Sequence, residues 1–302
     1  MRLRRDEPIE VKNPAQLAVM REAGLVTAAA LRAAAAAVEP GISTAELDAI
    51  AEREILGAGA MPSFKGYYGY PATICTSVND QIVHGIPSRR QVLRDGDVVS
   101  IDCGAIVGGW HGDSALTVQV GVPAPGAPHT PEELSGLLRA CELALWHGLA
   151  RATPGARLGD VSHAVASAAR AAGSYGIVRE YTGHGIGSQM HMEPPVPNVG
   201  RAGRGPILRA GMALAIEPML VLGRPATRLL DDGWTVVTAE GGWAAHFEHT
   251  VAVTDDGPVV FTADDGGASG FAALRAAQHG AWPEPLTRTP VGTSAAGEHD
   301  GL

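Results

Sequence analysis

Apolar and polar positions repeat with a helical period in four parts of the chain. We expect helices at about 14–38, 43–56, 131–151 and 158–172. Alanine, leucine and valine give the first segment a buried face, and Pro40 follows its end. Ser43 precedes the second segment and Glu46 lies three residues later, as in a capping box.

Other segments alternate with the two-residue period of strands and are rich in β-branched residues. They are Val98–Val107, Ala115–Val120, Met212–Glu217, Thr235–Val237 and His246–Val253. Helix pairs that alternate with antiparallel strand groups indicate an α+β domain. From residue 263 to 302 the chain is rich in Gly, Ala, Ser, Thr and Pro, which predicts a mostly disordered tail with one short helix at 271–278.

Composition describes an ordinary globular chain. Its 302 residues are 45% hydrophobic, which is enough for a sizeable core, and 23 basic against 32 acidic residues give a net charge of −9. This balance argues against a nucleic-acid or anionic-membrane surface. The sequence has no signal-peptide or membrane-spanning stretch, so we expect a cytoplasmic location. Three widely spaced cysteines predict free thiols.

Two aspartates flank a predicted tight turn. Gly108 and Gly109 separate two strand-like stretches, with Asp102 before the turn and Asp113 after it. In that register Gly104 faces Asp113, so both carboxylates lie on one face of the hairpin, about 7 Å apart at Cβ. Two such acids can converge on a pair of metal ions, although a solvated polar hairpin face would give the same pattern.

Three more side chains with metal-binding chemistry stand in glycine-rich or apolar surroundings. Glu217 interrupts LAIEPM and Glu248 interrupts HFEHTVAV, and His184 lies in TGHGIGSQMHMEPPVPN, whose glycines and prolines predict an irregular loop. Alone, each acid is typical of a half-buried strand edge and the histidine of a surface residue. Together with Asp102 and Asp113, however, the glutamates would make four buried carboxylates, which need cations beside them.

The donor set of oxygens and one imidazole suits two divalent ions in a catalytic role. Cobalt, manganese, iron and zinc all accept it, and the sequence does not choose among them. Two ions at such a site favour hydrolysis. Covalent acyl transfer is not indicated, since there is no GxSxG motif and no cysteine in a nucleophile context. His111 shares the hairpin with Asp113, but we interpret it as structural.

Five motifs then carry a resemblance to a known family. They stand in the order SVNDQIVHGIP, IDCGAIVGGWHGD, TGHGIGSQMHMEPPVPN, AIEPM and FEHTVAVTDDG. In them the chain closely resembles the type I methionine aminopeptidases. The resemblance implies the α+β pita-bread fold, a central antiparallel sheet flanked by helices with pseudo-twofold symmetry. It also implies a short tail at 1–10, a metallo-aminopeptidase catalytic domain at 11–262 and a tail at 263–302.

The same resemblance assigns roles to the metal-binding residues. Asp102, Asp113 and Glu248 would hold one metal, and the second would be held by Asp113, His184, Glu217 and Glu248. Asp113 and Glu248 would bridge the two ions. Glu217 would also accept a proton from the attacking water and pass it towards the leaving amine.

Further residues are implied in substrate binding. His191 would hydrogen-bond the scissile carbonyl oxygen, and His84 would contact the peptide nitrogen next to the cut. The methionine side chain would meet aromatic rings and sulfur, which suit a thioether: Phe64, Tyr67, Tyr70, Cys75, Met190 and Trp234. Phe64, Tyr68 and Met190 depart from residues frequent in the family, which affects the expected pocket width.

The implied function is removal of the initiator methionine from nascent polypeptides, preferring a small second residue. Partners would be nascent N-termini near the ribosome, with no direct nucleic-acid role and no membrane. Two alternatives stay open. One is an Xaa-Pro aminopeptidase, and the other is a noncatalytic binding module of the same fold.

Overall fold

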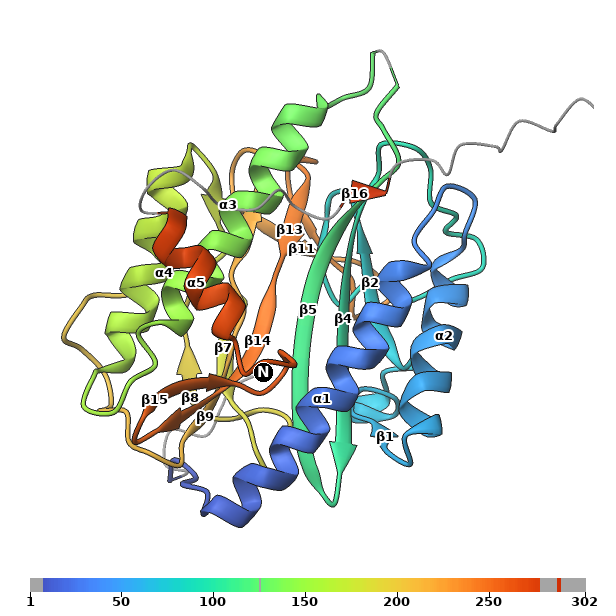
Figure 1. Cartoon of the computed structure of the whole chain (residues 1–302). Helices are drawn as coiled ribbons and strands as arrows, with labels where there is room; N and C mark the ends of the chain where they lie inside the picture. Colours follow the sequence, from blue (N-terminus) through green and yellow to red (C-terminus); the bar gives the residue numbers. More distant parts are fainter. Residues whose placement is uncertain (1–7, 125, 278–286, 289–302) are drawn as a thin grey trace, which may run out of the picture.

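The computed structural model describes residues 8–124, 126–277 and 287–288 (Figure 1). The helices are α1 (Pro14–Ala36), α2 (Thr44–Gly57), η1 (Tyr67–Gly69, 3-10), α3 (Pro131–Leu149), α4 (Leu158–Ala172) and α5 (Ala268–Ala277). The strands are β1 (Met61–Pro62), β2 (Ile74–Val78), β3 (Gln81–Val83), β4 (Val98–Val107), β5 (Trp110–Val120), β6 (Gly176–Ile177), β7 (Gly183–Gly185), β8 (Met192–Val196), β9 (Ala213–Ile216), β10 (Met219–Val221), β11 (Thr227–Leu229), β12 (Val236–Thr238), β13 (Ala244–His246), β14 (Glu248–Thr254), β15 (Gly257–Val260) and β16 (Thr287–Arg288).

A ten-stranded sheet forms the centre of the molecule. Its main path runs β1-β4-β5-β14-β9-β7-β8, with β2, β15 and β16 attached to it. All of its pairings are antiparallel except that of β16 with β5. Two smaller sheets, β13-β10-β6 and β11-β12-β3, complete the described strands. The predicted α+β class is therefore confirmed.

The four predicted helices are present, and local capping explains where they begin. Asn13 N donates to Gln16 Oε1 at 2.9 Å and Gln16 N donates to Asn13 Oδ1 at 3.0 Å, which satisfies two free amides at the start of α1. The predicted pair at α2 also forms, since Ser43 N donates to Glu46 Oε2 at 2.9 Å. The helix ends lie within two residues of the predicted ones.

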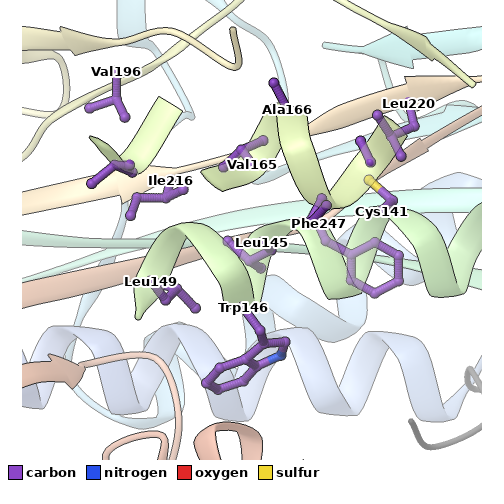
Figure 2. Close-up of a cluster of buried hydrophobic side chains, with 14 of the residues drawn as sticks. Cys141, Leu145, Trp146, Leu149, Val165, Ala166, Val196, Ile216, Leu220 and Phe247 are labelled. Carbon is purple, nitrogen blue, oxygen red and sulfur yellow. The ribbon is translucent and has the colours of Figure 1, made fainter. Parts of the chain in front are cut away.

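Each helix pair covers one half of the sheet. One buried cluster joins α1 and α2 to β4, where Val99, Ile101 and Cys103 point towards the helices. A second cluster joins α3 and α4 to β9 and β14, as Figure 2 shows for Leu145, Val165 and Ile216 among other labelled residues. Two helix-and-strand halves around one sheet agree with the expected pseudo-twofold arrangement (Figure 1).

The helices occupy one face of β4, so alternate residues point the other way. Asp102 lies between Ile101 and Cys103, which belong to the helix-facing cluster, and its side chain points to the opposite face. The predicted hairpin is confirmed in detail. Gly108 and Gly109 have φ values of 54° and 83°, as a two-residue hairpin turn requires, and Gly104 pairs with Asp113.

The prediction of an irregular loop around His184 was wrong. Gly183–Gly185 forms strand β7 between β9 and β8, and Met192–Val196 forms β8 despite its two prolines. Because β8 is the last strand of the path, its prolines need not donate to a further neighbour. Glycine at 185 allows close packing, since a Cβ there would fall onto the main-chain oxygen of Glu193.

The segment after residue 262 is only partly described. The short helix expected at 271–278 is present as α5, which packs on α3 with Leu274 buried, so this part of the expected disordered tail is ordered. Apart from β16, the remaining tail residues lie outside the described part of the chain. The three cysteines are free and buried. In the described ranges, no helix has both the length and the apolar character needed to cross a membrane.

Candidate metal centre and substrate pocket

A pocket of about 390 Å³ opens on the face of the sheet that is turned away from the helix pairs. It brings together residues from η1, β2, β4, β5, β7, β14 and the intervening loops. All thirteen predicted site residues line it: Phe64, Tyr67, Tyr70, Cys75, His84, Asp102, Asp113, His184, Met190, His191, Glu217, Trp234 and Glu248. Sequence motifs spread from residue 64 to residue 248 thus meet in one cavity.

Three of the five predicted metal-binding residues already form a compact cluster. Ligand atoms of Asp113, His184 and Glu248 all lie within 4.8 Å of one another, and the three residues are 3%, 4% and 2% exposed. Glu217 adjoins them, with Oε1 3.6 Å from His184 Nε2. Asp102 is placed by the hairpin two residues along β4 from Gly104, the partner of Asp113.

Three of the carboxylates in this cluster each have one oxygen without a hydrogen-bond donor in the described chain. Asp102 Oδ1, Asp113 Oδ1 and Glu248 Oε1 are buried and have no partner among the described residues. Burial raises the pKa of Asp102 to about 7. Burial, followed by the charges of neighbouring carboxylates, raises the pKa values of Asp113, Glu217 and Glu248 well above their usual range. Without a counter-charge these acids would hold protons at neutral pH.

The ring of His184 is oriented by its neighbour on β7. Its Nδ1 lies 3.0 Å from Gly185 O, and a carbonyl oxygen can only accept, so Nδ1 carries the proton. Nε2 is then a free lone pair, directed at Asp113 Oδ2 at 3.8 Å and Glu217 Oε1 at 3.6 Å. Burial lowers the pKa of His184 to about 4, which keeps the ring neutral.

The donor set fits two divalent cations. Four carboxylates balance the charge of two such ions. The carboxylate oxygens without donors need an electropositive partner, and the imidazole presents its lone pair to the same space. Oxygen and nitrogen donors of this kind suit manganese, iron, cobalt or zinc.

His246 is a site residue that the sequence interpretation missed. It is 1% exposed on β13, and its Nε2 lies 3.7 Å from Glu217 Oε2. Nε2 has no hydrogen-bond partner in the described part of the chain. The predicted strand His246–Val253 could have suggested this residue, because two-residue spacing places His246 on the same face as Glu248. The structure divides that stretch at Phe247 into β13 and β14.

Aromatic rings and sulfur form the apolar wall of the pocket. Phe64, Tyr70, Cys75 and Met190 are buried in one cluster, with Trp234 packed against them. Tyr70 and Trp234 meet edge to face with ring centroids 5.0 Å apart. The Tyr70 hydroxyl lies 3.1 Å from Ile74 O and 3.0 Å from Gly85 O, so hydrogen bonding to the main chain fixes the ring.

Two neutral histidines stand between this wall and the carboxylates. The rings of His191 and His184 lie 4.3 Å apart, and the Tyr67 hydroxyl is 2.9 Å from His191 Nδ1. Burial and then the adjacent His184 lower the pKa of His191 to about 2. Burial likewise lowers the pKa of His84 to about 4, and its ring faces Tyr181 and Trp234 edge-on. Both can therefore act as neutral hydrogen-bonding groups.

The pocket has ten further lining residues that the sequence did not assign to the site, although Val83, Thr182, Gly183 and Met219 lie within the quoted motifs. They are Tyr68, Val83, Glu180, Tyr181, Thr182, Gly183, Met219, Leu229, Gly233 and Val236. Most come from loops or from strands of two or three residues, which carry too little periodicity for recognition. His111, interpreted as structural, is not among the lining residues, and its Nδ1 lies 3.0 Å from Ser63 Oγ.

Comparisons with known proteins agree with this geometry. A family model described as metallopeptidase family M24 matches residues 18–255. "Methionine aminopeptidase 1" of Mycobacterium tuberculosis (strain CDC 1551 / Oshkosh) is 54% identical over 262 residues, covering 85% of this chain and 96% of that protein. The crystal structure of methionine aminopeptidase from Thermotoga maritima has a TM-score of 0.81 at 37% identity, covering 85% of this chain and 100% of that chain.

A more distant match supports the fold alone. Prolidase from Pyrococcus furiosus gives a TM-score of 0.64 at 20% identity, over 84% of this chain and 65% of that chain. The expected pita-bread fold is confirmed by these structures, and the segment matched by the family model contains all five predicted metal-binding residues. The chain therefore belongs to metallopeptidase family M24 and, within that family, to the methionine aminopeptidases.

Proposed function

We propose that this protein removes the N-terminal methionine from polypeptides by metal-dependent hydrolysis, preferring a small second residue. One observation carries the proposal. Buried carboxylate oxygens without donors lie in the same cavity as a wall of aromatic and sulfur-containing side chains. The carboxylates suit cations that hydrolyse a peptide bond, and the wall suits an unbranched thioether side chain.

The metal-binding residues divide into two overlapping sets. Asp102, Asp113 and Glu248 would hold one ion, and Asp113, His184, Glu217 and Glu248 would hold the second, so that Asp113 and Glu248 bridge. Manganese, cobalt, iron or zinc bound here would supply Lewis-acid stabilisation of the negative charge that develops on the carbonyl oxygen.

Glu217 is the residue best placed to move protons. Its carboxylate lies between His184 and His246, at 3.6 Å from the Nε2 of the first and 3.7 Å from that of the second. Burial lowers the pKa values of these histidines to about 4 and about 3, so neither protonates at neutral pH to neutralise the carboxylate. Glu217 would accept the proton of the attacking water and deliver it to the leaving amine.

His191 would donate a hydrogen bond to the scissile carbonyl oxygen. Burial raises the pKa of Tyr67 to about 12, so its hydroxyl keeps its proton and can donate to His191 Nδ1. The histidine proton then resides on Nε2, which makes that nitrogen the donor. His84 would contact the peptide nitrogen next to the cut.

The wall would select the first side chain of the substrate. The wall is an apolar cluster without charged members, formed by Phe64, Tyr70, Cys75, Met190 and Trp234. A charged first side chain would therefore lose its hydration there without compensation. Tyr67 would close the same subsite beside His191.

The substrates follow from this chemistry. We propose that nascent polypeptide N-termini are the partners, met close to the ribosome in the cytoplasm, and that neither nucleic acid nor a membrane takes part. The net charge of −9 is unsuited to binding either surface broadly.

A peptide assay tests the proposed function. Protein supplied with Mn²⁺, Co²⁺ or Fe²⁺ is expected to release methionine from Met-Ala-Ser and to leave a peptide with proline in second place and a residue other than methionine in first place intact. Cleavage of the proline peptide alone would make it an Xaa-Pro aminopeptidase. Purified protein that contains no metal and stays inactive with all three ions would make it a noncatalytic module.

Replacing His191 by alanine is expected to lower kcat by about 10²- to 10³-fold, the usual effect of losing one donor to a developing oxyanion. Metal content should stay at the wild-type level, because His191 is assigned no ligand role. Tyr67→Phe should lower kcat less, because it removes only the group that orients the ring. Steady-state kinetics and metal analysis of the purified variants check both expectations; loss of metal from His191→Ala contradicts the assigned role.

A further inference from the structure

Strand β14 meets β5 in an unusually short ladder at the bottom of the pocket. Only Glu248 with Ala115 and His249 with Ser114 pair across these strands in the described chain. Counted from the pair of Glu248 and Ala115, a step of two residues in one direction places Thr250 opposite Asp113. The same step in the other direction places His246 opposite Thr117. Both of these flanking positions contain a residue of the candidate site and a threonine.

At the first flanking position a side chain takes the place of main-chain pairing. Asp113 N donates to Thr250 Oγ1 at 3.0 Å, and Thr250 Oγ1 donates to Asp113 O at 2.8 Å. One hydroxyl thus satisfies both polar main-chain groups of Asp113. Thr250 is fully buried, so no water competes for these groups.

The second flanking position repeats this arrangement with the threonine on β5 and the site residue on β13, which ends just before β14. His246 N donates to Thr117 Oγ1 at 2.9 Å, and Thr117 Oγ1 donates to His246 O at 2.9 Å. Thr117 is 1% exposed, and its hydroxyl is also 2.9 Å from Ser100 Oγ, which can donate to it. Its one proton and two lone pairs are then all used.

Each hydroxyl reaches from its own strand to the main chain of the other. The strands can therefore lie farther apart at these positions than a main-chain ladder allows, where neighbours are about 4.8 Å apart. Glu248 lies midway between the two bridges, with Asp113 and His246 held on either side of it. The bridges thus fix the spacing of three side chains around the carboxylate cluster.

We propose that Thr250 and Thr117 are positioning residues of the metal centre. Thr250 fixes Asp113, whose carboxylate faces His184 and lies in the metal-binding cluster. Thr117 fixes His246, which in turn lies against Glu217. Neither threonine is among the residues that line the pocket. The inference rests on the proposed function, because it concerns how the predicted ligands are held.

Thr250→Val and Thr250→Ser separate the hydroxyl from the shape of the side chain. Valine has nearly the same volume but leaves the N–H and C=O of Asp113 unpaired, whereas serine keeps the hydroxyl. We expect Thr250→Val to weaken Mn²⁺ binding by about 10- to 100-fold, as loss of an orienting partner commonly does. Thr250→Ser should stay within about threefold of wild type. Isothermal titration of the purified full chain with Mn²⁺ measures both values.

Thr44 provides a matched control far from the pocket. Its Oγ1 accepts from Ser88 N at 2.9 Å and donates to Ser88 O at 3.1 Å, which is the same reciprocal pattern at the start of α2. Thr44→Val should lower the midpoint of thermal unfolding and leave Mn²⁺ affinity unchanged. This comparison distinguishes a positioning role from a general loss of stability.

Thr117→Val should affect turnover more than metal binding. His246 contacts the carboxylate cluster through Glu217, so kcat should fall by about tenfold or more while KM for Met-Ala-Ser changes little. Thr117→Ser should restore kcat. Wild-type kcat in folded Thr117→Val, or an equal loss of kcat in Thr117→Ser, would show that the hydroxyl is not what matters and would overturn the role of Thr117.

The remaining outcomes decide the proposal directly. Wild-type Mn²⁺ affinity in folded Thr250→Val overturns the role of Thr250 and leaves the proposed function intact. Failure of the wild-type chain to bind Mn²⁺, Co²⁺ or Fe²⁺ contradicts the proposed function itself. If Thr250→Val does not fold, Thr250→Cys applies the same test, because a thiol is a weaker hydrogen-bonding group: weakened Mn²⁺ binding supports the role, and wild-type binding overturns it.

Discussion

Alanine in place of Asp113 is expected to reduce kcat/KM for Met-Ala-Ser by more than about 10³-fold, beyond the 10- to 100-fold that loss of a merely orienting partner costs. The variant removes a carboxylate assigned to both ions. It also removes the charge facing His184 Nε2, 3.8 Å away. Glu248→Ala should have an equally large effect, because Glu248 is the other assigned bridge.

The measurement combines kinetics with metal analysis. Each variant is purified in parallel with Asp255→Ala, which removes an exposed acid in the turn between β14 and β15. That control should keep wild-type activity and wild-type metal content. Full activity in Asp113→Ala would show that the carboxylate cluster is not the metal centre.

Removing the cations with a chelator is expected to abolish activity and to lower the midpoint of thermal unfolding. Binding one ion at a free concentration of about 100 times Kd stabilises the folded state by about 2.7 kcal/mol. For a domain of this size that corresponds to a midpoint about 5 °C higher or more. Activity should return when Mn²⁺ or Co²⁺ is added back.

The stability of the chelated protein should also depend on pH in a characteristic direction. Burial raises the pKa of Asp102 from its ordinary value of 3.8 to about 7, and raises those of Asp113, Glu217 and Glu248. The folded chain therefore binds more protons than the unfolded chain at intermediate pH. The contribution of these four groups to the free energy of unfolding is fully present below about pH 4 and is lost as the pH rises through 7.

Cations compete with those protons for the same carboxylates, so the stabilisation by Mn²⁺ should itself depend on pH. The gain in unfolding midpoint on adding Mn²⁺ should be larger at pH 8 than at pH 5, because at the lower pH protons occupy the same carboxylates. Calorimetric scans with chelator and with Mn²⁺ at both pH values measure it. An equal gain at both would show that the buried acids do not hold the ion.

The helices and the central hairpin could be predicted because local signals determine them. Capping pairs at Asn13 and Ser43 and the two glycines at 108 and 109 act within a few residues. Predicting the hairpin register was sufficient to place Asp102 and Asp113 on one face. No long-range information was required for that part of the site.

Strands β7 and β8 could not be predicted from local signals. Glycines and prolines discourage strand formation in isolation, but the position of β7 between β9 and β8 supplies hydrogen-bonding partners that the sequence does not display. His184 is therefore held by a strand and not by a loop, which explains its low exposure of 4%.

The residues that surround the predicted ligands depended on the folded chain for their discovery. Thr117 and Thr250 are ordinary strand residues in sequence, and their hydrogen bonds join positions 129 and 137 residues apart. His246 was recognised through its distance to Glu217. Side chains that act by orienting a neighbour are hard to recognise in a sequence motif, because the reacting group belongs to the neighbour.

The prolines at both ends of the strand path affect how the protein behaves among unfolded chains. β1 contains Pro62, and β8 contains Pro194 and Pro195, so each terminal strand has fewer amide donors. An extended polypeptide arriving at the pocket finds few main-chain groups with which to extend the sheet, and edge-to-edge aggregation is discouraged.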